Sequence, residues 1–439
     1  MDQILREGQT VRTEPSGMPC TAEKLLGAGG QGEVYKAQLG GEAVALKWFF
    51  PQMATAEQRA AIELLVRKGP PNERFLWPLE LASDPQVQGF GYVMALRPPR
   101  FKNIVDLMKR RIEPTFRSLA TAGVNLSHDY LQLHSQGLCY RDISFGNAFF
   151  DPDNGDVLIC DNDNVAVDGA GTLGVLGTPR FMAPEVVRGE TVPSTQTDLF
   201  SLAVLLFYMM MVAHPLEGRK ETEIKCLDLP AMTKLYGTEP LFIFDPQDRS
   251  NEPVPGIHDN AIAFWPIYPQ FLRDLFTRSF TDGLRDPHAR VRESEWRATC
   301  VRLRDAIIYC PYCYLENFYD GEALKASGGA PVPCWSCKIE LRLPPRIRIG
   351  KSVVMLNYNT QLFPHHTDDA RMYDFSKPVA TVMEHPTQKG IWGLKNLSTD
   401  RWVVTTSDGA VKDVEPERSV TLAKDTKIHF GKAEGIIRV

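Results

Sequence analysis

The sequence predicts an α+β protein in which a two-lobed domain is followed by two small modules, and three changes of pattern support this. Residues 1–113 alternate short apolar strands with glycine-rich turns, whereas residues 114–308 carry apolar residues at helical spacing. Residues 309–345 then bear closely spaced cysteines, and residues 346–439 return to short strands separated by turn residues. Within the helical lobe, the proline- and glycine-rich residues 237–266 predict a surface insertion.

Composition agrees with a folded protein and limits its partners. The chain has 439 residues, of which 43% are hydrophobic and 23% are charged, and its net charge is −5. This balance gives no basic field, so neither nucleic acid nor an anionic membrane is expected as the main partner. The apolar run at residues 199–213 is shorter than the roughly 20 residues that cross a bilayer, and it predicts a buried helix. The first ten residues lack the pattern of a secretory signal, so we expect a cytoplasmic protein.

A glycine-rich turn between two strand-like runs predicts a nucleotide site. Residues 26–34 read LGAGGQGEV and contain the pattern GxGxxGxV. Glycines let backbone N–H groups close over phosphate oxygens, and the next strand carries Lys47, which could neutralise the α- and β-phosphates. This order of strand, hairpin, strand and lysine differs from a Rossmann fold and favours phosphoryl transfer. The predicted nucleotide-contacting residues are Gly27, Gly29, Gly32, Val34, Ala45 and Lys47.

Three polar residues farther along the chain supply the rest of such a site. Residues 140–147 (YRDISFGN) fit the pattern RDxxxxN, in which Asp142 could accept the proton of a substrate hydroxyl and Asn147 could bind a magnesium or manganese ion. Asp161, at the end of a strand-like run, is the second candidate metal ligand. Helix caps and loop carboxylates would explain each residue alone, but they do not explain the order and spacing.

Residues 17–308 resemble a Hanks-type (eukaryotic-like) serine/threonine protein kinase. The resemblance rests on these motifs and on residues 177–185 (GTPRFMAPE), which are similar to the GTxxYMAPE segment of the family. It implies a bilobal protein-kinase fold and an enzyme that transfers the γ-phosphate of ATP, bound with Mg²⁺, to serine or threonine of protein substrates. It also implies that Glu185 and Arg290 form a buried ion pair and that Asp198 opens the long buried helix.

The resemblance assigns further roles around the nucleotide. A helix glutamate should pair with Lys47, and the family spacing points to Glu63, with Glu57 as the alternative. Met94 would occupy the gatekeeper position before the hinge.

The resemblance also points to regulation in the loop after Asp161. Thr178 matches the threonine that contacts the catalytic Asp142, and Arg141 matches the arginine that pairs with a phosphorylated activation loop. Thr172 is therefore the candidate regulatory phosphosite, although a plain solvent-facing threonine would look the same. Phosphorylation there would add about two negative charges that Arg141 could bind.

Several residues near the predicted catalytic site differ from the family pattern, and these differences bear on whether the protein is an active kinase. The segment that is usually DFG reads Asp161-Asn162-Asp163, which keeps the metal-binding residue but replaces the hydrophobic plug and the flexible glycine. Tyr140 replaces a histidine, and Ser144 replaces a lysine that helps to hold the γ-phosphate. Because the four catalytic-site residues described above remain, an active kinase is favoured over a pseudokinase that binds ATP and recruits partners.

Two CxxC pairs separated by twenty residues predict a four-thiolate Zn²⁺ site in a zinc ribbon. Because the protein supplies all four ligands, the zinc is expected to be structural. A redox-active CxxC is the alternative, although two knuckles are redundant for that role. Nearby basic residues, among them Lys338 and Arg342, leave contact with nucleic acid as a further alternative. The predicted zinc ligands are Cys310, Cys313, Cys334 and Cys337.

Residues 346–439 also resemble a forkhead-associated (FHA-like) β-sandwich. The likeness rests on residues 392–398 (WGLKNLS) and 428–431 (IHFG). Lys351 stands where phosphothreonine readers of that family have an arginine, so a partner-docking module is expected, with an unrelated small β-barrel as the alternative. The fused arrangement resembles bacterial kinases of stress-response systems, which implies a phosphatase and a von Willebrand-type domain protein as partners.

Overall fold

The computed structural model describes residues 3–169 and 177–439 and divides the chain into two compact units. Unit 1 comprises Met1–Trp265 and Asp274–Ala298, and unit 2 comprises Pro266–Arg273 and Thr299–Val439. The predicted cysteine-bearing segment and the predicted all-β module fall together in unit 2.

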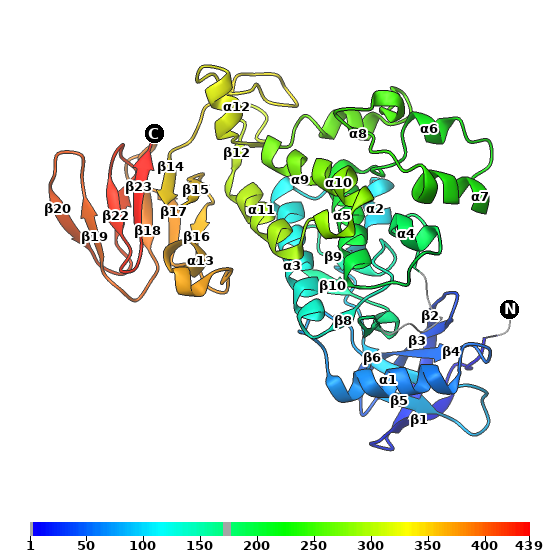
Figure 1. Ribbon diagram of the computed structural model, residues 1–439. Coiled ribbons are helices and arrows are strands. Elements are labelled where there is room, and N and C mark those ends of the chain that lie inside the picture. Colours follow the sequence, from blue (N-terminus) through cyan, green and yellow to red (C-terminus); the bar gives the residue numbers. More distant parts are fainter. Residues whose placement is uncertain (1–2, 170–176) are drawn as a thin grey trace. The chain divides into compact units, whose positions relative to one another are not determined.

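The first lobe of unit 1 is a closed barrel of six strands in the order β1-β2-β3-β4-β6-β5 (Figure 1). Strand β1 pairs antiparallel with β2 on one side and with β5 on the other, and so closes the barrel. It lies before residue 17, where the family resemblance begins, and it buries the alternating side chains of Val11 and Thr13. The strands are β1 (Thr10–Glu14), β2 (Pro19–Ala28), β3 (Gly32–Leu39), β4 (Glu42–Phe49), β5 (Glu80–Ser83) and β6 (Gly91–Ala95).

One helix, α1 (Ala56–Lys68), belongs to this lobe. It begins where the Thr55 side chain accepts a hydrogen bond from the Gln58 backbone, and it ends before Gly69, whose positive φ of 76° terminates the helix. Only Ile62 and Leu65 on the helix are buried. The helix therefore packs through a narrow apolar stripe and leaves its charged residues half-exposed or exposed.

The second lobe of unit 1 is built around α5 (Thr195–Met211). A capping box between Ser194 and Thr197 starts this helix, and every residue from 197 to 211 is buried. The apolar run therefore forms the buried core helix that the sequence predicts. No helix in the described part of the chain is long and apolar enough to cross a membrane. The other long helices after the first lobe are α3 (Phe116–Ser135), α9 (Gln270–Phe280) and α11 (Glu293–Asp305). Helices α9 and α11 contribute residues to both units.

Short elements complete the second lobe. The short helices are α2 (Ile104–Met108), α4 (Pro184–Val187), α6 (Arg219–Thr222), α7 (Leu229–Met232), α8 (Asp259–Phe264) and α10 (Asp282–Arg285). The short strands are β7 (Lys102–Asn103), β8 (Leu138–Cys139), β9 (Ala148–Phe150), β10 (Val157–Ile159) and β11 (Ala166–Val167).

The predicted surface insertion at residues 237–266 is partly a core element. Phe242 is fully buried, and its ring lies 5.8 Å from that of Phe207 on α5. Phe244 stacks on Trp265 with ring centroids 4.3 Å apart. The prolines and glycines of this segment correctly indicate that it is not one continuous helix. Their spacing does not reveal that aromatic side chains of the same segment fill the core.

Unit 2 contains a cysteine-bearing segment and a two-sheet β-region. Strands β12 (Ile307–Tyr309) and β13 (Glu316–Phe318) form a hairpin, and helix α12 (Gly321–Ala326) follows. One later sheet has six strands in the order β15-β14-β23-β22-β19-β20, and the other has four in the order β16-β17-β18-β21. Buried side chains from both sheets, such as Ile347, Leu394 and Trp402, form one core, so the two sheets pack face to face.

The elements of the β-region are as follows in chain order: β14 (Arg346–Ile349), β15 (Ser352–Met355), β16 (Gln361–Leu362), α13 (Pro364–Thr367), β17 (Ala380–Glu384), β18 (Trp392–Asn396), β19 (Trp402–Thr405), β20 (Val411–Val414), β21 (Ser419–Thr421), β22 (Lys427–His429) and β23 (Glu434–Arg438).

A buried charge cluster joins three helices of unit 1. His134 near the end of α3 contacts Asp198 on α5 through Nε2 at 3.1 Å and Glu293 on α11 through Nδ1. Burial alone would lower the pKa of His134, but the hydrogen bonds and charges of the two carboxylates outweigh it and raise the pKa to about 9.

This shift predicts a pH dependence of folding stability. A histidine whose pKa rises from about 6.5 to about 9 on folding stabilises the native state fully below pH 6.5, and this stabilisation is lost as the pH rises through about 9. We expect the free energy of unfolding to fall between pH 7 and pH 10 by up to about 3 kcal/mol more in the wild type than in His134→Gln. Urea denaturation across this range measures it, and parallel pH profiles for the two proteins would contradict the prediction.

Candidate active site

The predicted nucleotide-contacting residues of the strands share one face of the barrel. Val34 on β3 lies opposite Lys47 on β4, and Lys47 in turn lies opposite Tyr92 on β6. Ala45 and Met94 form the next pair on the same face, because side chains two residues apart point the same way. The register therefore brings these five side chains together in front of the second lobe.

The glycine-rich turn joins β2 to β3. A Cβ atom at Gly32 would lie 2.1 Å from the carbonyl oxygen of Trp48, so the close approach of β4 requires glycine there. At Gly27 and Gly29 a Cβ would meet nothing within 4 Å, which leaves the backbone at the tip open to a ligand. The Gln31 side chain ties this tip to the second lobe by donating a hydrogen bond to Asn164 Oδ1 at 3.1 Å.

Asp142 lies at the centre of a hydrogen-bonded loop. Its Oδ1 accepts bonds from both the backbone and the hydroxyl of Thr178 at 2.8 Å, and its Oδ2 accepts a bond from Asn147 Nδ2 at 3.0 Å. Burial raises the pKa of Asp142, whereas the bonds from Thr178 and Asn147 oppose that rise. Because the Asn147 amide nitrogen is engaged here, its amide oxygen is the atom left to bind a cation.

Asp198 on α5 fixes the backbone of the loop that carries Asp142. Its carboxylate accepts hydrogen bonds from the backbone N–H groups of Tyr140 and Arg141, the latter at 3.0 Å. Arg141 has a positive φ of 73°, and its side chain donates to the backbone carbonyl of Asn164. Thr172, the predicted phosphosite, lies outside the described residues.

Lys47 is buried between two acidic residues of the segment that reads Asp161-Asn162-Asp163. Its Nζ lies 2.9 and 3.0 Å from the two oxygens of Asp163 and 3.5 Å from Asp161 Oδ1. Burial alone would lower the pKa of the ammonium, but Asp163 and then Asp161 raise it above its usual value. The Asp161 side chain is 41% exposed and so remains open to a ligand.

The predicted pairing of Lys47 with Glu63 is absent from the structure. Glu63 lies on α1 with its side chain 40% exposed, and it pairs with Arg59 at 3.2 Å. Glu57, the alternative, is exposed in the first turn of the same helix. The physical reason is that both carboxylate oxygens of Asp163 accept hydrogen bonds from the Lys47 ammonium, so Asp163 takes the place of a helix glutamate as its counterion.

Comparison with known proteins bears on the second lobe. Residues 100–265 match the family model of the protein kinase domain. This part of the chain is therefore similar to a protein kinase domain. The matched range holds Asp142, Asn147, Asp161 and Asp198, whereas the strand lobe with Lys47 precedes it.

Several relatives carry kinase names. The chain is 26% identical over 217 residues to the probable serine/threonine-protein kinase CCRP1 of Zea mays, an alignment that covers 47% of this chain and 34% of the relative. It is 30% identical over 210 residues to the DNA damage-responsive serine/threonine-protein kinase RqkA of Deinococcus radiodurans, with 46% and 31% covered. It is 24% identical over 189 residues to glycogen synthase kinase 1 of Pyricularia oryzae, with 39% and 48% covered. The matched part therefore spans 31% to 48% of the length of these relatives.

Two residues of this candidate site, Asp163 and Tyr92, are missing from the sequence-based prediction. In the sequence, Asp163 stands out only as a departure from the family pattern. Tyr92, whose hydroxyl donates to Asp163 Oδ1 at 2.9 Å, belongs to no recognisable motif. A buried acidic residue needs a buried cation as its partner, and Lys47 is the cation that the sequence already assigns to the site. The acidic character of Asp163 is therefore the sequence signal for its contact with Lys47.

In unit 2, the four cysteines of the predicted zinc ribbon converge. One sulfur from each lies within 4.8 Å of the others, with Cys310 and Cys337 Sγ atoms 3.5 Å apart and those of Cys313 and Cys334 3.6 Å apart. Burial opposes ionisation of Cys334, but backbone N–H groups of Cys337 and Ser336 lower its pKa to about 6. This donor set of clustered soft sulfurs fits a tetrahedral Zn²⁺ ion.

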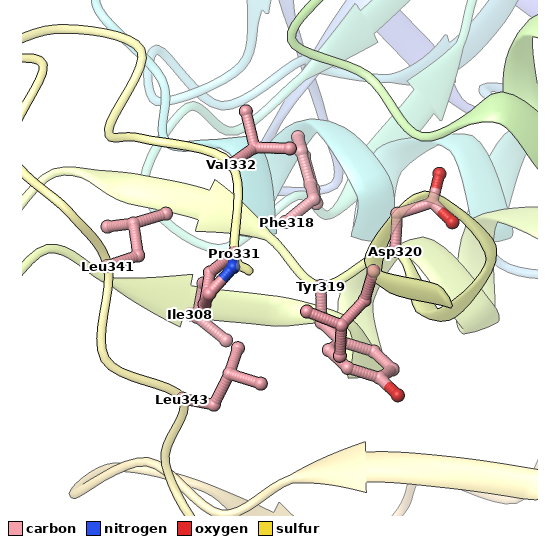
Figure 2. A pocket seen from close by; sticks show the side chains of 9 residues that line it. Ile308, Phe318, Tyr319, Asp320, Pro331, Val332, Leu341 and Leu343 are labelled. Carbon is pink, nitrogen blue, oxygen red and sulfur yellow. The ribbon is translucent and has the colours of Figure 1, made fainter. Parts of the chain in front are cut away.

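A small apolar cavity lies beside the ribbon (Figure 2). Its volume is about 30 Å³, which is the space of roughly one water molecule, so it is too small for an organic ligand. Ile308, Leu341 and Leu343 line it together with Val332. The cavity belongs to the packing around the ribbon rather than to a ligand site.

Unit 1 contains the buried ion pair that the resemblance implies. Arg290 donates from both terminal nitrogens to the two oxygens of Glu185, each at 2.8 Å, in a bidentate pair. The Arg290 side chain is only 2% exposed, and it also donates to the carbonyls of Gly283 and Gln196. The pair thus ties the segment after Thr178 to the end of unit 1.

Removal of this arginine should destabilise unit 1 strongly. Arg290→Ala leaves the Glu185 carboxylate and two carbonyls without their donor, and we expect a loss of about 3–5 kcal/mol in the free energy of unfolding. The matched control is Arg278→Ala, which removes a half-exposed pair with Glu295 and should cost about 0–1 kcal/mol. Urea denaturation compares the two, and equal losses would contradict the prediction.

Proposed function

We propose that this protein transfers the γ-phosphate of ATP to serine or threonine hydroxyls of protein substrates. The observation that carries the proposal is the convergence of four groups at one site: Asp142 with Asn147 at 3.0 Å, and Lys47 with Asp161 at 3.5 Å. The kinase-domain match and the relatives' names support it.

The roles follow from position and charge. The hydroxyl oxygen of the substrate forms a bond to the γ-phosphorus while the bond from that phosphorus to ADP breaks, and the hydroxyl proton passes to Asp142. Lys47 would neutralise the α- and β-phosphates, and the open glycine tip would cover them. Asn147 and Asp161 would hold Mg²⁺, which when bound neutralises phosphate charge. Thr178 holds Asp142 in place through its two hydrogen bonds.

Substitution of Asp142 tests the enzyme directly. Asp142→Asn keeps the shape of the side chain but cannot accept the proton, so we expect phosphate incorporation to fall by about 10²- to 10⁴-fold. Asp153→Asn, at an exposed position in the same lobe, is the matched control and should keep wild-type activity. Labelled ATP with a generic protein substrate, followed by mass spectrometry of modified sites, measures both. Equal incorporation by the two variants, or none by the wild type, would overturn the proposal and leave a pseudokinase.

We also propose a cellular setting of bacterial stress signalling in the cytoplasm. The support is the name of RqkA, a DNA damage-responsive kinase, together with nine free cysteines, which suit a reducing compartment. A phosphatase and a von Willebrand-type domain protein are the partners that the resemblance in sequence organisation suggests. Basic residues near the ribbon gain no support as a nucleic-acid site from the kinase relatives.

The modules of unit 2 are proposed to be a structural zinc ribbon and an FHA-like partner-docking sandwich. The clustered sulfurs support the first, and the two packed sheets support the second.

The zinc proposal predicts one bound zinc ion per chain. Cys334→Ser should abolish zinc binding and lower the melting temperature, because three thiolates bind the ion less tightly and the ribbon has few other core residues. Cys226→Ser removes an exposed cysteine far along the sequence from the ribbon and should leave both quantities unchanged. Elemental analysis and thermal denaturation measure them. Full zinc content in Cys334→Ser would contradict the site.

A further inference from the structure

The counterion of Lys47 comes from an unexpected element. The ammonium is enclosed, with 6% of its side chain exposed, and its two shortest contacts, at 2.9 and 3.0 Å, are both to Asp163. The Asp163 side chain is 0% exposed. A buried carboxylate and a buried ammonium at this distance each leave the other unpaired if one is removed, which is costly in a protein interior.

The protein holds Asp163 firmly in this position. Its Oδ1 also accepts a hydrogen bond at 2.9 Å from the hydroxyl of Tyr92, which projects from β6 on the same barrel face as Lys47. Asp163 lies in a short 3₁₀ turn, Asn162–Asn164, directly after Asp161. The turn is anchored by Asn162, whose amide nitrogen donates at 2.9 Å to the backbone carbonyls of Leu76 and Ile159.

The acidic side chains of helix α1 do not pair with Lys47. Glu63 on α1 is paired with Arg59, and Arg59 also contacts Glu14 of β1. The acidic residues of α1 are therefore engaged with the barrel surface or exposed, while Lys47 faces the turn that carries Asp161.

We propose that Asp163 is the positioning residue that orients Lys47 for the nucleotide phosphates, and that Glu63 is dispensable for this role. The inference rests on the proposed function for its catalytic consequence. The ammonium has three N–H donors, of which Asp163 uses two, and the third remains for Asp161 or for a phosphate oxygen. The turn that follows the predicted metal ligand Asp161 thus also positions the lysine.

Kinetic constants for ATP test the positioning role. Asp163→Asn keeps the size of the side chain but removes its charge, and we expect kcat/KM for ATP to fall about 100-fold, with contributions from both kcat and KM. Tyr92→Phe removes one hydrogen bond to Asp163, and we expect a smaller fall, about threefold to tenfold, with the fold intact by circular dichroism. Glu63→Gln is the matched control on α1 and should stay within twofold of the wild type. A loss in Glu63→Gln equal to that in Asp163→Asn, or unchanged kcat/KM in Asp163→Asn, would overturn the inference.

A second measurement does not depend on turnover and separates failure of this inference from failure of the proposed function. In a double-mutant cycle on thermal denaturation, Lys47→Met and Asp163→Asn should each lower the melting temperature, and the double variant should lose less than the sum of the two. Lys47→Met combined with Glu63→Gln should give the simple sum. Additive losses for Lys47 and Asp163 would overturn the pairing even if the wild type is an active kinase. A wild type without phosphate transfer but with coupling between these two residues would overturn only the proposed function.

Discussion

The carboxylate of Asp198 is the constraint on which the geometry of the site depends. A loop that carries reactive side chains leaves backbone N–H groups without helix or sheet partners, and buried N–H groups of this kind are costly unless they are paired. Asp198 satisfies two of them, at Tyr140 and Arg141, from the first turn of α5, where the helix dipole also favours a negative charge. Contact with His134 then joins this carboxylate to α3 and, through Glu293, to α11. The position of Asp142 is therefore fixed by the core of the lobe rather than by the loop itself.

The turn Asn162–Asn164 is polar and buried, although the family pattern has an apolar side chain at the position of Asn162. Asn162 and Asp163 are almost completely buried. The Asn162 amide nitrogen donates to two backbone carbonyls, and the Asp163 carboxylate accepts hydrogen bonds from Lys47 and Tyr92. A hydrophobic side chain can leave one apolar pocket for another at little cost, whereas these groups would lose several directed hydrogen bonds and an ion pair. The polar sequence of this turn thus favours one conformation over switching between two.

The parts of the structure that the sequence predicts well are those that depend on local spacing. The glycine turn, the RDxxxxN loop and the CxxC knuckles each place their ligating atoms through a few adjacent backbone positions, and the structure brings each set together. The partner of Lys47 depends instead on which of several carboxylates reaches it across the fold, and family spacing pointed to Glu63 rather than Asp163. Strand β1 and the buried aromatic side chains near Phe242 were not identified for the same reason, because their roles depend on pairing and packing between segments far apart in sequence.

Unit 2 shows how a metal segment with little core of its own can share the core of its neighbour. Met355 of β15 is buried in one cluster with Ile308, Leu341 and the sulfurs of Cys310 and Cys334. Asn357, just beyond β15, donates from its side chain to the carbonyl of Ile307 at 2.7 Å. The ribbon therefore packs on the first strands of the β-region and is not an independent domain. Because the two share buried surface, the stability of the ribbon and that of the adjoining sheet edge should be coupled, and the change in sequence character near residue 345 marks a change of composition within one folding unit.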